Sequence, residues 1–67
     1  MKNLIAALRK RRHITQEALA EAVGVTRQTI ISLESGRYNP SLRLAHKLAV
    51  YFETSIESIF AFEEAGA

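Results

Sequence analysis

Hydrophobic and polar positions alternate along the chain with the period of α-helices. No run shows the strict two-residue alternation that predicts a half-buried strand. The two clearest helical patterns lie on either side of Gly24, within residues 16–35. Their apolar faces consist of Leu19, Ala20, Val23, Val25, Ile30 and Leu33. The pattern predicts helices over 16–23 and 27–35, with Gly24 suited to the left-handed residue at which a helix ends.

The same pattern predicts three further helices, over 4–12, 42–52 and 55–60. Thr15, Thr26 and Ser41 are suitable N-caps for three of the five helices, and Asn3 is a candidate cap for the first. Thr54 and Glu57 have the spacing of a capping box for the last helix. Gly36 and the Asn39-Pro40 turn separate the third helix from the fourth. A chain of 67 residues is one domain, and we expect it to be all-α with five helices.

Two helices joined by a short turn that contains glycine are typical of the helix-turn-helix, whose second helix enters the major groove of DNA. The charge distribution is consistent with such a role. Residues 1–52 carry nine Lys/Arg against three Glu, whereas residues 53–67 carry four Glu and no Lys/Arg. A basic body with an acidic end favours a polyanionic partner, and the alternative is solvated charge that serves solubility.

Other classes of function find little support in the sequence. The absence of cysteine excludes disulfides and thiolate zinc sites. The longest apolar run near the N-terminus, Leu4 to Leu8, is far shorter than the ~20 residues of a membrane span. His13 and His46 lack metal-ligand spacing and are expected at the surface. We therefore expect a cytoplasmic protein that is not an enzyme and has no cofactor, metal, membrane contact or evident small-molecule ligand.

The stretch TQEALAEAVGVTRQTIISLESGRYNPSL resembles the phage-repressor/Cro (XRE) type of helix-turn-helix regulator. Ala20 stands where the two helices cross in that family, and Gly24 stands at the turn. The S-G-x-x-x-P-S-L run that follows and the S-I-E-S-I-F close are also similar to the family. The resemblance covers residues 1–60 and leaves 61–67 as a short acidic end. It implies a five-helix lambda-repressor-like domain that binds operator DNA, usually as a dimer, and regulates transcription.

The outward side of the second helix of the motif supplies the candidates for reading bases. The candidate residues are Arg27, Gln28, Ile31 and Ser32. Arg27 can donate two hydrogen bonds to guanine O6 and N7, and Gln28 can pair with adenine N6 and N7. Ile31 is unusual on a side that should be polar. It either contacts a thymine methyl, or is a neutral surface residue, or turns partly under the helix over 42–52.

Phosphate contacts set the position of such a protein on the duplex rather than its sequence preference. Thr26 and Thr29 place hydroxyls at the N-terminus of the second helix, which is itself suited to anions. The family resemblance adds Gln16, Arg37, Tyr38 and Asn39 as further phosphate contacts. For Asn39, the alternative is a turn residue before proline with no contact to DNA. The resemblance also implies a structural ion pair between Arg9 and Glu34.

A homodimer is expected because a small core leaves apolar residues over and because one recognition helix reads few bases. The expected interface lies near the last helix and the end of the helix before it. Its candidate residues are Val50, Tyr51, Phe60 and Phe62. The leading hypothesis is therefore a regulator, most simply a repressor, that binds a palindromic operator. The alternative is an antitoxin-like protein-interaction module whose acidic end binds a partner.

Overall fold

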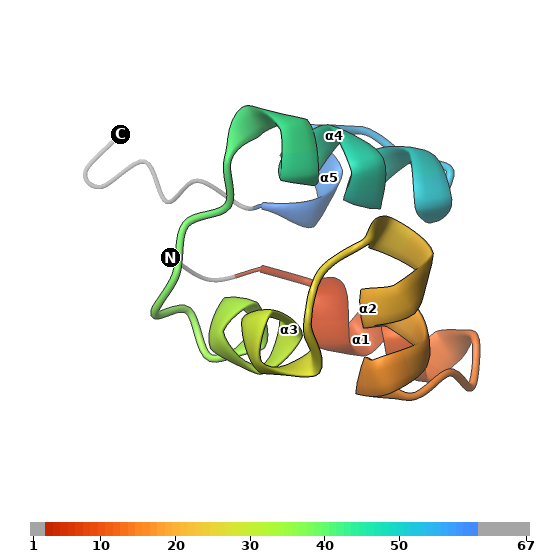
Figure 1. Cartoon of the computed structure of the whole chain (residues 1–67). Coiled ribbons are helices and arrows are strands. Elements are labelled where there is room, and N and C mark those ends of the chain that lie inside the picture. The colour runs from red at the N-terminus through yellow and green to blue at the C-terminus, as the bar shows by residue number, and fades with distance from the viewer. Residues whose placement is uncertain (1–2, 61–67) are drawn as a thin grey trace.

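Five helices make up the regular structure of the computed structural model, which describes residues 3–60 (Figure 1). The helices are α1 (Ile5–Arg11), α2 (Gln16–Val23), α3 (Arg27–Glu34), α4 (Leu42–Tyr51) and α5 (Ile56–Ile59). No strand occurs among the described residues, so the predicted all-α, five-helix architecture is confirmed. The acidic end predicted over 61–67, including Phe62, lies outside the described residues.

Four of the five helices begin at a serine or threonine whose hydroxyl accepts a backbone N–H three residues further on. The caps are Thr15, Thr26, Ser41 and Ser55. Each cap satisfies one of the backbone donors that a helix N-terminus leaves unpaired. The capping box predicted at Thr54 is therefore wrong by one residue, because Ser55 accepts from Ser58 instead.

The first helix begins differently from the other four. Leu4 is its N-cap and contributes no side-chain hydrogen bond. The side chain of Asn3 still acts on this end, because its Oδ1 accepts the backbone N–H of Ile5 at 3.1 Å. The predicted capping role of Asn3 is thus displaced by one position along the chain.

The glycines that end α2 and α3 have positive φ angles, as the sequence predicts. Gly24 has φ 76° and Gly36 has φ 82°. His13 and Glu53 have φ 58° and 55° after α1 and α4, although neither residue is a glycine. A left-handed backbone brings Cβ close to the following carbonyl, so these two positions carry a conformational cost.

One apolar core joins all five helices. Its fully buried side chains are Ile5, Leu19, Ile30, Leu33, Leu48 and Ile59. Phe60 is 2% exposed and belongs to this core. The expectation that Phe60 lies in a dimer interface is therefore wrong, because its ring is used to fill the core of its own chain.

The helices pack so that α3 keeps one face outward. α2 packs against both α3 and α4, and α4 packs against α5 (Figure 1). The two ends of the described segment are joined, since the Leu4 N–H donates to the Ile59 carbonyl at 2.8 Å. The packing of α1 and α2 on α3 fixes its inner face and leaves the opposite face free.

Replacing Glu53 with glycine should stabilise the domain by about 0.5–1 kcal/mol. The change removes the left-handed strain of about 1–2 kcal/mol, and the greater freedom of unfolded glycine offsets part of the gain. Chemical denaturation measures the free energy of unfolding. Glu21→Gly, at an exposed site inside α2, is the matched control and should destabilise by about 1 kcal/mol. Equal effects of the two changes would contradict the assignment of strain to Glu53.

Candidate nucleic-acid interface

Helix α3, the predicted recognition helix, has an inner face and an outer face, as the sequence predicts. Ile30 and Leu33 are fully buried on the inner face. On the other side, Arg27 and Gln28 are exposed in the first turn. Helical geometry places residues three and four apart on the same side, so the outer residues form one continuous surface.

Ile31 and Ser32 are only partly exposed on this outer surface. Five partly buried hydrophobic residues pack against the core, namely Leu8, Ile14, Val25, Tyr51 and Ile56. Ile31 is not one of them, so the structure does not support the alternative in which it turns under α4. This apolar side chain on the outer side of α3 is partly open to solvent and is available for contact with another molecule.

A polar cluster of three side chains joins α3 to α1 and α2. Arg9 Nε donates to Glu34 Oε2 at 2.8 Å, and Arg9 Nη2 donates to Glu34 Oε1 at 3.3 Å. Gln16 Nε2 donates to the same Oε1 at 3.1 Å. The side chains of Arg9 and Glu34 are 13% and 10% exposed, so the pair is largely shielded from water. We call Arg9, Gln16 and Glu34 the α3 clamp, because it fixes the C-terminal end of the recognition helix.

Two further contacts support the α3 clamp. Arg9 Nη1 donates to the Ile14 carbonyl at 3.0 Å, which orients the guanidinium in a fixed plane. Asn3 Nδ2 donates to the Leu33 carbonyl at 2.7 Å. That carbonyl also accepts the Gly36 N–H at 3.1 Å, so Asn3 supplies a second donor to an oxygen at the end of α3. Sequence reasoning missed this second role of Asn3, because a contact across 30 positions leaves no local signal.

The N-terminal end of α3 carries a pair of hydroxyls. Thr26 Oγ1 accepts the Thr29 backbone N–H at 3.2 Å and lies 3.0 Å from Thr29 Oγ1. Thr26 is exposed and Thr29 is partly buried. The two predicted phosphate contacts therefore lie together at the positive end of the helix dipole.

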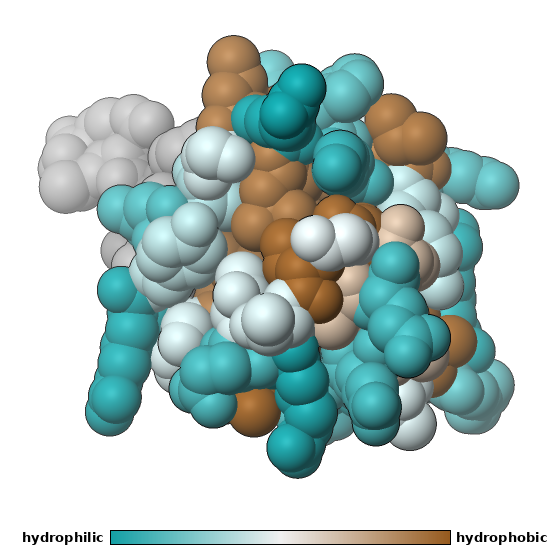
Figure 2. All heavy atoms as spheres, in the orientation of Figure 1, coloured by the Kyte–Doolittle hydropathy of each residue, from teal (hydrophilic) through white to brown (hydrophobic). Residues whose placement is uncertain are grey.

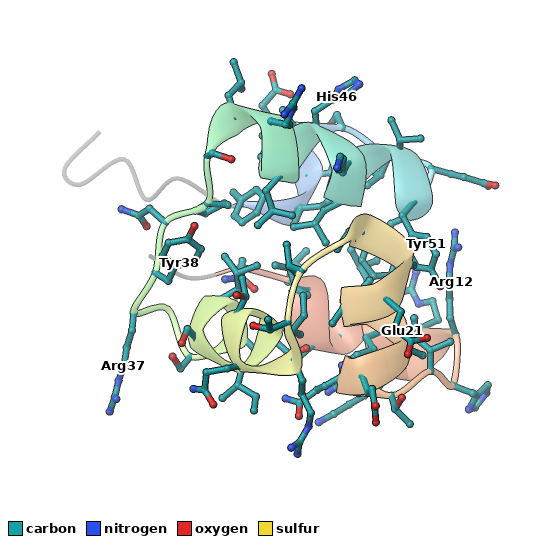
Figure 3. The ribbon with its side chains drawn as sticks, viewed as in Figure 1. Arg12, Glu21, Arg37, Tyr38, His46 and Tyr51 are labelled. Atoms are coloured by element: carbon teal, nitrogen blue, oxygen red, sulfur yellow. The ribbon has the colours of Figure 1, made fainter. Side chains whose placement is uncertain are left out.

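The loop after α3 carries the other residues that are predicted to contact DNA phosphates. Arg37, Tyr38 and Asn39 are all exposed, and Arg37 extends away from the body of the molecule (Figure 3). The Arg37 N–H donates to the Ser32 carbonyl at 3.2 Å, which ties the loop to α3. An extended cation on a tethered loop can reach a polyanion beside the recognition helix.

Gln16 and Arg27, one from each helix of the motif, are brought together by the fold. They line a hollow of about 540 Å³ together with Arg9, Thr15 and Glu17. Sequence reasoning placed Gln16 among phosphate contacts and Arg27 among base contacts, and the structure puts both at one edge of the outer surface. A guanidinium and an amide at the edge of a hollow are suited to anionic oxygens.

The candidate interface residues at the end of α4 differ in exposure. Val50 is 61% exposed, whereas Tyr51 is partly buried. The Tyr51 ring contacts Phe52 edge-on, with centroids 5.1 Å apart. The guanidinium of Arg12 lies 5.5 Å from the Tyr51 centroid, and its Nη1 donates to the Tyr51 carbonyl at 3.0 Å (Figure 3). Tyr51 is thus largely engaged within its own chain, and Val50 is the freer apolar residue.

The described residues contain no group of three side chains suited to a metal ion. Within the same residues, no helix combines the length and apolar character needed to cross a membrane. The outer surface of the helix-turn-helix is polar and partly cationic, with Arg27 and Gln28 exposed on it. This arrangement defines the class as a DNA-binding domain.

Comparisons with known proteins agree with this class. The helix-turn-helix family model matches residues 5–59. An uncharacterized HTH-type transcriptional regulator of Methanothermobacter thermautotrophicus is 57% identical over 68 residues, which cover 100% of this chain and 99% of that protein. The HTH-type regulator YgzD of Bacillus subtilis is 48% identical over 64 residues, covering 96% of this chain and 97% of that one.

A solved structure shows the same architecture. The restriction-modification controller protein C.AhdI from Aeromonas hydrophila superposes with a TM-score of 0.76 at 30% identity, covering 84% of this chain and 85% of that one. The chain belongs to the Cro/C1-type (XRE) helix-turn-helix family of transcriptional regulators. The family resemblance noted in the sequence is thereby confirmed.

Glu34→Ala should lower the free energy of unfolding by about 3 kcal/mol. The change leaves the shielded Arg9 guanidinium without its anion, which costs more than the ion pair itself contributes. Glu21→Ala, at an exposed glutamate of α2, is the control and should stay within about 0.5 kcal/mol of the wild type. The double change Arg9→Leu with Glu34→Leu should recover part of the loss. A single-mutant loss no greater than that of the control would contradict a stabilising role for the clamp.

Proposed function

We propose that the chain is a sequence-specific repressor that binds a palindromic operator as a homodimer. The observation that supports it best is the outer surface of α3, on which Arg27 and Gln28 are exposed while Ile30 and Leu33 are fully buried. A helix presented in this way fits the major groove, which is about 12 Å wide. The α3 clamp supports the proposal, because a recognition helix must keep its angle when it enters the groove.

The division of labour on the DNA follows from the chemistry of the exposed groups. In our proposal Arg27 binds guanine O6 and N7, Gln28 binds adenine, and Ile31 contacts a thymine methyl. Ser32 lies further along the same surface and can bond to a base edge. Phosphates on either side of the groove are bound by six further residues, namely Gln16, Thr26, Thr29, Arg37, Tyr38 and Asn39.

The homodimer is proposed because one recognition helix contacts only a few base pairs. Two helices related by a two-fold axis read half-sites about 34 Å apart and so demand a palindromic site. The exposed Val50, at the end of α4, supports an interface there, with Tyr51 beside it. Phe60 takes no part, because it is buried in its own chain.

Arg27→Ala should flatten the preference among duplexes, and Arg37→Ala should weaken all duplexes alike. Loss of a bidentate contact removes about 1–3 kcal/mol of discrimination against the wrong base. Loss of one phosphate contact lowers the slope of log affinity against log salt by about one. Affinities measured over a panel of duplexes at several salt concentrations separate the two effects. A changed sequence preference in Arg37→Ala would contradict the assignment of that residue to phosphate.

Val50→Glu should weaken self-association by about tenfold or more, equivalent to about 1.4 kcal/mol, because it places a charge in an apolar contact. Sedimentation equilibrium at micromolar concentrations measures the dissociation constant. Leu42→Glu is the matched control, since Leu42 is 78% exposed at the opposite end of the same helix. A wild-type protein that sediments only as a monomer would refute the proposed interface.

A further inference from the structure

Arg43 and Lys47, which have no role in the function proposed above, line a cavity between the helix-turn-helix and α4. Its volume is about 280 Å³. Val25 and Leu44 contribute apolar surface, while Thr29, Tyr38, Arg43 and Lys47 supply polar groups around it. On the face of the molecule seen in Figure 2, hydrophobic atoms near the centre lie among hydrophilic ones. We call this cavity the α4 slot.

The charges around the α4 slot are all positive. Arg43 and Lys47 are four residues apart, so they lie on the same side of α4, where like charges destabilise a helix. Among the described residues no carboxylate forms an ion pair with either of them, and α4 carries no acidic residue. Two unpaired cations that repel each other beside one cavity create a local preference for an anion.

The position of Lys47 keeps its charge at the cavity. Its Nζ is 3.9 Å from the point where a Cβ on Gly24 would lie, so the ammonium extends over the turn of the motif. The C-terminal end of α2 favours a cation there and accounts for part of this placement. It does not account for Arg43, which lies at the start of α4, where the helix dipole disfavours a cation.

We propose that the α4 slot binds an oxyanion of the phosphate type between Arg43 and Lys47. The Thr29 and Tyr38 hydroxyls supply further donors, and Val25 and Leu44 offer apolar surface to the carbon skeleton that carries the anion. The volume is just below the ~300–1,000 Å³ of common ligand sites, which suits one phosphodiester with its sugar. Where the proposed function holds, the source is the DNA backbone, because Thr29 and Tyr38 are also proposed phosphate contacts. The other source of the same chemistry is a free phosphate compound.

Neutralising one cation at a time tests whether the phosphate bound in the α4 slot belongs to the DNA backbone. Lys47→Gln and Arg43→Gln should each lower the slope of log affinity against log salt by about 0.9, the value for one phosphate contact on duplex DNA. Lys10→Gln removes the same charge from an exposed position on α1 outside the slot, and should change the slope less. All three residues are exposed, so the variants should fold, and circular dichroism checks that they do.

Inorganic phosphate, added in the absence of DNA, tests whether the α4 slot binds a free phosphate compound. Titration of sodium phosphate against sodium chloride at matched ionic strength should give saturable shifts of the Val25, Thr29 and Lys47 amide resonances. Lys47→Gln should abolish these shifts, and Lys10→Gln should retain them. This arm does not depend on DNA binding, so it still tests the slot if the wild type binds no duplex and the proposed function fails.

The two arms together decide the proposal. A reduced slope in both slot variants assigns the slot to the DNA backbone. Saturable amide shifts with phosphate, without a change in the salt slope of DNA binding, assign the slot to a free phosphate compound. This result would contradict the assignment of the slot to the DNA backbone. The proposal that the α4 slot binds phosphate is contradicted by two results together. These are salt slopes in Arg43→Gln and Lys47→Gln equal to that of Lys10→Gln, and no saturable shift of the amide resonances with phosphate.

Discussion

The orientation of α3 depends on the hydrogen bonds that the carboxylate of Glu34 accepts. This carboxylate accepts hydrogen bonds from Arg9 on α1 and from Gln16 on α2, with distances of 2.8 to 3.3 Å. Asn3 adds a hydrogen bond of 2.7 Å to the neighbouring Leu33 carbonyl. Apolar packing is non-directional and would allow α3 to rotate by small angles. Directional hydrogen bonds at its C-terminal end restrict that freedom, and so determine which side chains face outward.

The rest of the fold depends on local signals at the helix ends and on one shared core. Four serine or threonine caps and two left-handed glycines set the ends of the helices, and a core drawn from all five helices encloses their inner faces. His13 and Glu53 repeat the left-handed ending without glycine, at some cost in stability. The caps at Thr15, Ser41 and Ser55 lie outside α3, so residues on the outer face of α3 can vary without changing these helix ends.

The sequence predicted the parts of this architecture that depend on local patterns. Helical periodicity and the caps at Thr15, Thr26 and Ser41 placed the helices to within a residue at each end, and Gly24 marked the turn. The errors concern long-range packing. Phe60 was expected at a surface and fills the core, and Asn3 was expected to cap one helix and also binds another. The sequence also did not predict the α4 slot, which Thr29 and Lys47 line, because spacing along a chain does not show which helices meet.

Selection of bound sites from random duplex DNA would show whether the outer surface of α3 reads DNA sequence. We expect enrichment of one palindromic site, with two half-sites centred about 34 Å apart along the duplex. The same selection with Arg27→Ala should lose preference at one position in each half-site, while the spacing is retained. Bound duplexes with no shared sequence would contradict this expectation, and would reduce the protein to a non-specific binder of DNA.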